Sequence, residues 1–336
     1  MRVRIIGAGV AGLTAAYECA RAGLEVELVE QREGPGLGCS HFAGGMLGPW
    51  CESESAEPPL LELGIESLAF WTKTLAVAEQ AGTLVVAAAR DQPDLQQFAR
   101  RALAFRRIGP AEIAELEPDL AGRFQAALYF PREAHLDPRA ALAALAGRLR
   151  LFENVSLHFG ANGASLPGSA DWVIDCRGLA ARDALPDLRG VKGEMLILST
   201  REVTLSRPVR FLHPRQSVYI VPRGDGRYMI GATVIENEEV GRITARAMLE
   251  LLGAAYALHP AFAEAEILET GAALRPAFPD NLPKIRRAGR RIFINGLYRH
   301  GFLAAPALAQ RAVKIICEDA YFPEVMDADH GQRQIA

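Results

Sequence analysis

The stretch RVRIIGAGVAGLTAAYECARAGLEVELVE, residues 2–30, decides the fold of this chain. It opens with a short apolar run at 3–6, which is typical of a buried parallel strand. Three glycines follow with the spacing G-x-G-x-x-G: Gly7, Gly9 and Gly12. Apolar residues then recur at helical spacing, and a second apolar run at 25–29 ends at Glu30. This order predicts a strand, a tight turn, a helix and a second, parallel strand.

Each glycine of this motif has a physical reason. Gly7 permits the tight turn, Gly9 lets the backbone approach a pyrophosphate, and Gly12 lets the helix pack closely on the strand. The helix N-terminus offers amide N–H groups and a partial positive charge to phosphates. Glu30 follows Gly12 by 18 residues, where an acid binds ribose hydroxyls and repels a 2′-phosphate. The stretch therefore predicts a dinucleotide site other than NADP. A glycine-rich turn without a ligand is the alternative, and the motif alone does not separate NAD from FAD.

The composition sets limits on the class of protein. With 336 residues, half of them hydrophobic, the chain is long enough for two globular domains. A formal charge of −3 and the lack of a dense basic run argue against nucleic acid and anionic membranes as partners. No apolar run approaches the roughly 20 residues that span a bilayer. The five cysteines show no C-x-x-C spacing, which suits a reducing compartment. We expect a soluble, cytoplasmic protein.

The rest of the chain changes character near Lys192. Before it, the patterns predict alternating helices and strands. Helices are expected over 60–79 and 138–149, a turn and short helix over 108–116, and strands over 83–88, 125–130, 155–159 and 172–175. After it, short strands are separated by turns: 194–199, 209–212, 218–221 and 228–232. The PRGDGR segment at 222–227 is a hairpin signal. A helix over 242–258, a strand over 291–295 and a closing helix complete the prediction.

This succession predicts an α/β protein, α+β overall, with a Rossmann-like domain and an inserted antiparallel-sheet domain. We expect the nucleotide-binding domain to be discontinuous, over 1–80, 132–191 and 271–336. The inserted substrate-binding domain would then comprise 81–131 and 192–270. A cleft between two such domains is a common place for a cofactor.

Several segments resemble the D-amino-acid-oxidase-type flavoproteins. They run in the family's order over nearly the whole chain: GAGVAGL with Glu30, AGGML (43–47), VKGEML (191–196), YIVPR (219–223), IGAT (230–233), LRP (274–276) and YRHGFLAAP (298–306). Within the family, the motifs are most similar to those of the glycine oxidases of thiamine biosynthesis. The resemblance implies FAD, with its flavin in the interdomain cleft and a small amine-bearing acid as substrate. A cysteine that would hold flavin covalently has no counterpart in PDNLPKI (279–285), so we expect noncovalent FAD.

The resemblance also implies which residues contact FAD. The backbone at Val10 and Ala11 would hold phosphate, Glu30 and Gln31 the adenosine ribose, and Asn162 the adenine. Cys39, Ser40 and the segment 44–46 would approach the flavin, and the loop 297–303 would wrap its pyrimidine edge. The implied cofactor residues are Gly7, Gly9, Val10, Ala11, Gly12, Glu30, Gln31, Cys39, Ser40, Gly44, Gly45, Met46, Asn162, Leu297, Tyr298, Arg299, His300, Gly301, Phe302 and Leu303.

Three side chains match the family's substrate-facing positions. Arg275 corresponds to the arginine that pairs with the substrate carboxylate, Tyr219 to a tyrosine that donates to it, and Arg299 to a second arginine near the flavin. Without the resemblance, Arg275 reads as a loop arginine and Tyr219 as a half-buried strand residue. His300 reads as a structural or solvated histidine, so no catalytic base is assigned, and the histidines show no metal-ligand spacing.

Two departures from the family pattern stand out. Gly44 precedes Gly45 where the family more often has alanine. The segment Cys176-Arg177-Gly178 stands where small residues are usual, which puts an arginine near the nucleotide or in a turn. The first departure falls inside a segment that the resemblance assigns to the cofactor site.

The function that we expect is oxidation of glycine with O₂ and water to glyoxylate, ammonia and H₂O₂. The Cα–H would leave as hydride to flavin N5, and the imine would serve thiazole formation in thiamine biosynthesis. Relatives suggest a homotetramer. Alternatives stay open: a sarcosine or broader D-amino-acid oxidase, a dehydrogenase with another electron acceptor, or an FAD-binding protein that oxidises no amine.

Overall fold

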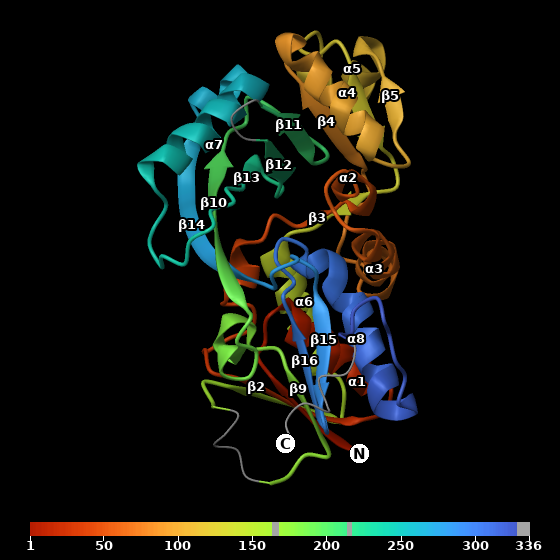
Figure 1. Ribbon diagram of the computed structural model, residues 1–336. Helices are drawn as coiled ribbons and strands as arrows, with labels where there is room; N and C mark the ends of the chain where they lie inside the picture. Colours follow the sequence, from red (N-terminus) through yellow and green to blue (C-terminus); the bar gives the residue numbers. More distant parts are fainter. Residues whose placement is uncertain (163–167, 214–216, 328–336) are drawn as a thin grey trace.

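Two β-sheets placed end to end form the frame of the protein. A computed structural model describes residues 1–162, 168–213 and 217–327, and Figure 1 shows the two sheets with their helices. The strands of one sheet come from 2–30, 155–175 and 284–295, and those of the other from 83–130 and 189–277. The domain boundaries given above stay a prediction, and their segments 163–167, 214–216 and 328–336 lie outside the described residues.

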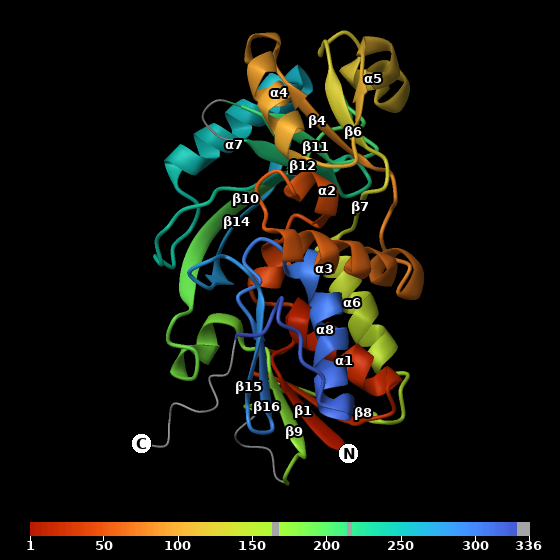
Figure 2. The ribbon, with the colours of Figure 1, turned by 45° about the vertical axis from the view of Figure 1, so that its right-hand side comes forward.

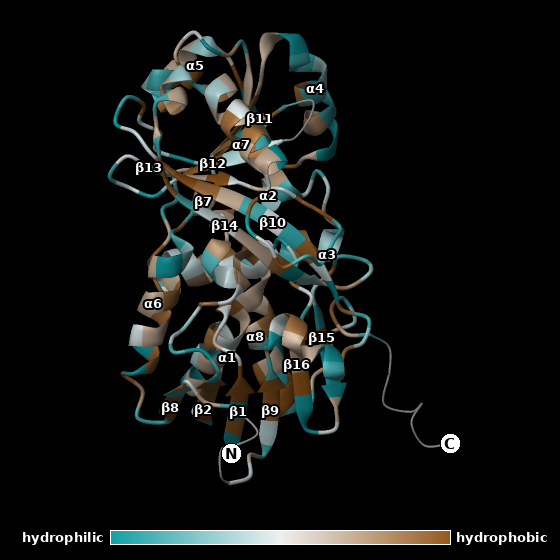
Figure 3. Cartoon of the chain, turned by 90° about the vertical axis from the view of Figure 1, so that its left-hand side faces the viewer, coloured by the Kyte–Doolittle hydropathy of each residue, from teal (hydrophilic) through white to brown (hydrophobic). Residues whose placement is uncertain are grey.

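The first sheet has six strands, of which all but the edge strand β15 run parallel. In sheet order they are β15 (Lys284–Ala288), β16 (Arg291–Asn295), β9 (Trp172–Asp175), β1 (Arg2–Ile6), β2 (Glu25–Glu30) and β8 (Val155–Phe159). Val3 and Ile5 of β1 are fully buried, and Figure 3 shows this strand in the hydrophobic colours. The parallel βαβ start predicted from the glycine motif is confirmed.

Helices cover one side of this sheet, as Figure 2 shows. They are α1 (Val10–Arg21), α6 (Pro138–Leu149) and α8 (Gly301–Glu318), with α3 (Pro58–Ala69) packed on α8. Helix α6 begins where the sequence predicts it, because Asp137 accepts hydrogen bonds from the backbone N–H groups of Arg139 and Ala140 at 2.8 and 3.2 Å. Pro138 at the first helical position fits the same start.

The second sheet has eight strands. In sheet order they are β14 (Glu266–Ala277), β10 (Arg189–Ser199), β13 (Arg227–Gly231), β12 (Val218–Pro222), β11 (Val209–Leu212), β4 (Thr83–Ala87), β6 (Ala127–Phe130) and β5 (Arg106–Ile108). Helix α7 (Ala245–Leu258) packs on β10, β12 and β13, and α4 (Gln92–Arg101) on β4 and β6. The predicted hairpin joins β12 to β13 through Gly224, Asp225 and Gly226, all with positive φ. A last short helix of this part is α5 (Pro110–Leu116).

The strands predicted after Lys192 pair antiparallel, as expected, and one pairing that the sequence did not predict is parallel. Strand β11 pairs parallel with β4, with Val209 opposite Leu84. Two chain segments far apart in sequence meet there, because β8 and β9 of the six-stranded sheet lie between β4 and β11 along the chain. No tight turn joins them, so nothing local forces an antiparallel pairing.

The predicted helix over 60–79 ends earlier in the structure. Helix α3 gives way to a π-helical turn, Phe70–Thr74, and Ala76 then adopts a positive φ of 54°. The chain leaves the helix because Glu79 pairs through its backbone with His135 of the short strand β7 (Ala134–His135), at 2.8 and 2.9 Å. A tertiary pairing here overrides a helical sequence pattern.

Several elements were not predicted. They are the helices α2 (Pro49–Glu52) and α4, and the strands β3 (Met46–Leu47), β5, β7, β14 and β15. β14 pairs with β10 along its whole length, and β10 itself begins five residues before its predicted start.

Among the described residues, no helix combines the length and apolarity that crossing a membrane requires.

Candidate active site

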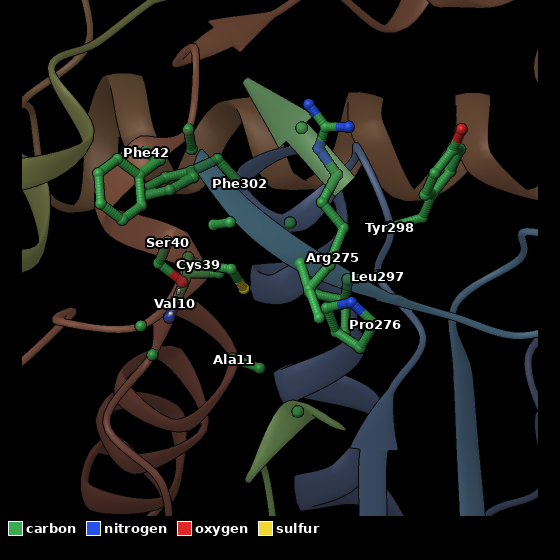
Figure 4. Close-up of a pocket in the computed structure, with 18 of the residues that line it drawn as sticks. Val10, Ala11, Cys39, Ser40, Phe42, Arg275, Pro276, Leu297, Tyr298 and Phe302 are labelled. Carbon is green, nitrogen blue, oxygen red and sulfur yellow. Dashed lines mark hydrogen bonds between the residues drawn. The ribbon is translucent and has the colours of Figure 1, made fainter. Parts of the chain in front are cut away.

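A cavity of about 890 Å³ lies between the two sheets. Its wall includes every residue that the sequence predicts for the cofactor or substrate, with the exception of Gly12. Figure 4 shows how residues from α1, β14 and the loops around 39–46 and 297–303 converge on this space. Positions that lie far apart in the sequence are thus brought to one site.

The glycine motif forms one end of the cavity. Gly7 has a φ of +102°, and a Cβ there would lie 2.6 Å from the carbonyl oxygen of Cys176. A Cβ at Gly12 would lie 1.7 Å from the carbonyl oxygen of Gly7, so Gly12 serves helix packing. Helix α1 begins at Val10, whose N–H donates to Ser40 Oγ at 3.1 Å. The first N–H groups of such a helix lack intrahelical acceptors and can bind phosphate.

Glu30 lies buried at the end of β2, beside Gln31 in the cavity wall. Its carboxylate accepts hydrogen bonds from the backbone N–H groups of Ala8 at 2.8 Å and Arg32 at 2.9 Å. A carboxylate has about four lone-pair directions, so two remain for ribose hydroxyls. The glycine backbone and the open helix end supply donors for phosphate, and the buried acid supplies acceptors for ribose hydroxyls. Together they are the groups that a dinucleotide such as FAD requires.

Two loops form the middle of the cavity. Cys39 and Ser40 begin a short 3₁₀ helix, Cys39–Phe42, and Gly45 follows with a φ of +74°. A Cβ at Gly45 would lie 2.1 Å from the carbonyl oxygen of Leu136, so this position requires glycine. Met46 then enters β3 and pairs with His135. The segment is therefore shaped by backbone contacts and presents its inner side to the cavity (Figure 4).

The second loop leads from β16 into α8. Tyr298 has a φ of +50°, and its N–H donates to the carbonyl oxygen of Pro276 at 2.9 Å. The side chain of Asn295 holds the loop by donating to the carbonyl oxygen of Gly178 at 2.9 Å. Because α8 begins at Gly301 in the cavity wall, a second helix N-terminus lends partial positive charge to the site.

Arg275 and Tyr219 lie at the other end of the cavity, on β14 and β12. Arg275 Nη1 donates to the carbonyl oxygen of Thr233 at 3.0 Å, and among the described residues no acid pairs with this guanidinium. The guanidinium lies against the backbone of Gly193, where a Cβ would come within 2.2 Å of Cζ. Burial lowers the pKa of Arg275 and raises the pKa of Tyr219, so the tyrosine keeps its hydroxyl proton.

Arg299, by contrast, has an acidic partner. Its Nη2 donates to Glu52 Oε2 at 2.7 Å, and Arg210 Nη1 lies 3.6 Å from Glu52 Oε1. Burial alone would raise the pKa of Glu52, but the two guanidinium groups lower it to about 2. Burial lowers the pKa of His300 to about 4, so this imidazole is neutral at neutral pH. The role of Arg299 in binding a substrate carboxylate stays a prediction.

Glu52 and Arg210 are cavity residues that the sequence did not single out. The one signal at Glu52 was an acid closing the otherwise apolar PWCE segment directly after the glycine-rich loop. Arg177 also lines the cavity, with its guanidinium paired to Asp175 and Asp183, and it precedes the turn at Gly178. Asn162 lines the cavity at the nucleotide end, next to Ala161. No cluster suited to a metal ion occurs among the described residues.

Comparisons with known proteins agree with this geometry. A protein of Rhizobium etli, named as a thiamine biosynthesis oxidoreductase, ThiO, is 53% identical over 96% of this chain and 99% of its own length. The glycine oxidase of Pseudomonas aeruginosa is 29% identical over 91% of this chain and 92% of its own. The crystal structure of iminodiacetate oxidase from Chelativorans sp. BNC1 superimposes with a TM-score of 0.79 at 27% identity. That match covers 94% of this chain and 95% of the oxidase.

The family model described as FAD dependent oxidoreductase matches residues 2–315, which is nearly the whole described chain. Three observations agree on the family of this chain. They are the α/β architecture with its glycine motif, the groups at the nucleotide end that suit FAD, and the matches along nearly the full length. The chain therefore belongs to the family of FAD dependent oxidoreductases, and FAD is its cofactor.

Proposed function

We propose that this enzyme oxidises the amino group of a small amino acid, glycine first of all, and passes the electrons to O₂. The observation that carries the proposal is the Arg275 guanidinium, which lies in the cavity beside Tyr219 without an acidic partner among the described residues. A cation held away from bulk water without a counterion favours an anionic ligand. A substrate carboxylate supplies that anion.

Each residue at this end has a task in the proposed reaction. Arg275, held by the Thr233 carbonyl, would donate two parallel N–H bonds to the carboxylate and fix its plane. The protonated hydroxyl of Tyr219 would donate to the same carboxylate. Together they orient Cα–H toward the flavin, which when bound supplies the two-electron acceptor. No protein base is assigned, because the neutral substrate amine itself can drive loss of hydride.

The choice of glycine is supported by the relatives. The Rhizobium etli relative, at 53% identity, is named as a thiamine biosynthesis oxidoreductase, and the Pseudomonas aeruginosa relative, at 29% identity, is named as a glycine oxidase. The products would be glyoxylate, ammonia and H₂O₂, with the imine available for thiazole formation. Comparing kcat/KM for glycine, sarcosine, D-alanine and D-proline tests this choice. A clearly higher kcat/KM for sarcosine or a D-amino acid would show that the enzyme is a sarcosine or broader D-amino-acid oxidase and not a glycine oxidase.

One spectroscopic experiment tests the reaction class. The purified, yellow protein is mixed with glycine without oxygen, and its flavin absorbance is followed before and after air is admitted. We expect bleaching by glycine and rapid recovery in air. Flavin that no amino acid bleaches would contradict amine oxidation, and slow recovery would indicate a dehydrogenase.

The clamp is tested by Arg275→Ala. Two charge-assisted hydrogen bonds are lost, so KM for glycine should rise roughly a hundredfold while FAD stays bound. Arg107→Ala is the control, because Arg107 is exposed on β5 and far along the sheet from the cavity. Unchanged glycine turnover in Arg275→Ala would show that the clamp lies elsewhere.

We further propose noncovalent FAD, a cytoplasmic location and a homotetramer. The five cysteines are free thiols, which fits a reducing compartment. Release of yellow colour on acid precipitation would test the noncovalent attachment. Sedimentation equilibrium of the holoenzyme would test the tetramer.

A further inference from the structure

The carboxylate of Glu52 faces the cavity with most of its hydrogen-bonding capacity unused. Its side chain is 19% exposed, and Oε2 accepts the one hydrogen bond that a described side chain makes to it, from Arg299. Oε1 lies 3.6 Å from Arg210 Nη1, beyond hydrogen-bond distance. A carboxylate has about four acceptor directions, so Glu52 can still accept from a ligand.

The position of Glu52 is fixed from several sides. It ends α2, and Glu133 Oε1 caps that short helix by accepting from the N–H of Cys51 at 2.6 Å. The Arg299 contact holds Oε2 from the loop before α8. An acid fixed in this way is preorganised, so it can bind a cation without losing side-chain freedom.

Glu52 is also the one acid suited to a ligand at this end of the cavity. The described lining residues include three carboxylates: Glu30, Glu52 and Glu194. Glu30 lies at the nucleotide end. Glu194 is fully buried, and Lys192, Thr233 and the Thr244 backbone already contact its oxygens. Glu52 therefore remains as the acid at the end of the cavity that holds Arg275, because both groups act electrostatically on the Tyr219 hydroxyl.

We propose that Glu52 binds the ammonium group of the substrate and selects an amino acid over a hydroxy acid of the same size. The inference rests on the proposed function, because it assumes a carboxylate at Arg275. A zwitterion then lies between two groups of opposite charge, with its carboxylate on Arg275 and its ammonium on Glu52. A hydroxy acid brings only the negative charge, and Glu52 repels it.

The proposal has a second consequence, in the pH dependence of turnover. A carboxylate beside an ammonium stabilises its charged form, whereas oxidation requires the neutral amine. Removing the Glu52 charge should therefore lower the pKa of the bound substrate amine and move the kcat profile to lower pH. The charged and titratable groups around Glu52 that act on the same balance are Cys51, Glu133, Arg210, Tyr219, Arg275, Arg299 and His300. Glu54 is connected to them only through Arg210.

The test compares glycine with glycolate on the FAD-loaded holoenzyme. Glu52→Gln keeps the shape and an acceptor for Arg299 but removes the charge. The dissociation constant for glycolate, which leaves the flavin oxidised, is measured from the change in flavin absorbance. The dissociation constant for glycine is measured without oxygen from the dependence of the flavin reduction rate on glycine concentration, or from the absorbance change itself where glycine does not reduce the flavin. We expect Kd for glycine to rise about tenfold or more and Kd for glycolate to fall, since a charge-assisted hydrogen bond is lost and a repulsion is relieved.

Glu54→Gln is the matched control. Glu54 lies 3.8 Å from the same Arg210 but is not part of the cavity wall, so both constants should stay within about twofold of wild type. Thermal melting and FAD content of both variants show whether the fold is intact. Equal losses of glycine and glycolate in Glu52→Gln, or an unshifted kcat profile, would overturn the proposal.

The two proposals fail in different ways. If wild-type flavin is bound but glycine does not reduce it, the proposed reaction is wrong, while the two dissociation constants still report on Glu52. If glycine reduces the flavin and Glu52→Gln binds it as wild type does, the reaction stands and the ammonium site is wrong.

Discussion

The ring of Tyr219 lies directly against the backbone of Gly44. A Cβ at position 44 would lie 2.4 Å from Tyr219 Cε2 and 2.9 Å from its hydroxyl oxygen. The glycine found here in place of the family's commoner alanine thus lets the tyrosine occupy its place in the cavity.

We predict that Gly44→Ala displaces Tyr219 and raises KM for glycine about tenfold, the effect of losing one hydrogen bond to a charged group. FAD content should be little changed. Gly147→Ala is the control, because a Cβ at Gly147 in α6 meets no neighbouring atom within 4 Å. Steady-state kinetics of both variants check this, and equal KM values would show that the ring accommodates the methyl group.

Removing only the hydroxyl of Tyr219 gives a second prediction. Tyr219→Phe should raise KM for glycine by about tenfold, clearly less than Arg275→Ala, because one hydrogen bond is lost and the guanidinium remains. The measurement is the KM ratio of the two variants at one pH. A larger effect for the tyrosine would mean that Arg275 is not the main carboxylate ligand.

Glu30 should matter for FAD and not for the substrate. Glu30→Gln leaves one oxygen for the two backbone N–H groups of Ala8 and Arg32, so the dissociation constant of FAD should rise about tenfold. Rebinding of FAD to apoprotein, followed by flavin fluorescence, measures it. Glu62→Gln, on the exposed side of α3, is the control and should bind FAD as wild type does. When Glu30→Gln is saturated with FAD, its KM for glycine should equal that of wild type.

Glu133 predicts a pH dependence of stability. Burial raises the pKa of this carboxyl from its ordinary value of 4.5 to about 8. The folded protein therefore holds a proton between pH 4.5 and 8 that the unfolded chain releases, so unfolding becomes easier as pH rises through this window. Glu133→Gln stays neutral. As pH rises from 5 to 8.5, the free energy of unfolding of Glu133→Gln should therefore increase relative to that of wild type. The increase in this difference is up to about 1.4 kcal/mol per pH unit.

Urea titrations of both proteins at pH 5 and 8.5 measure this gain. The glutamine keeps an oxygen for the Cys51 N–H, so the cap of α2 is preserved. A stability difference that does not change between the two pH values would mean that Glu133 is ionised in the folded protein.

The features that the sequence predicts well are those fixed by local sterics. The Gly7 to Gly12 spacing, the start of α6 at Pro138 and the hairpin at 224–226 each depend on residues close together in the chain. Such patterns determine the conformation before any distant contact forms.

What could not be predicted depends on contacts between distant segments. Strand β14 has the sequence EILETGAALRPA, whose Glu, Gly, Ala and Pro disfavour a strand, and it is extended because β10 pairs with it. The contact of Glu52 with Arg299 joins residues 247 positions apart. No spacing rule reveals such a pair.

The ladder between β10 and β14 bears on how substrate reaches its site. Eleven paired positions connect these two strands of the eight-stranded sheet, from Ser199 opposite Glu266 to Arg189 opposite Ala277. Figure 1 shows the two strands extending toward the six-stranded sheet, and residues 193–195 of β10 line the cavity. Apart from one register shift between Ile197 and Leu198, this ladder is unbroken, and it resists a wide opening of the cavity by bending between the two sheets. We therefore expect substrate to enter and leave through small movements at the rim of the cavity, where Val240 is 89% exposed. Turnover should therefore respond to the bulk of rim side chains more than to solvent viscosity.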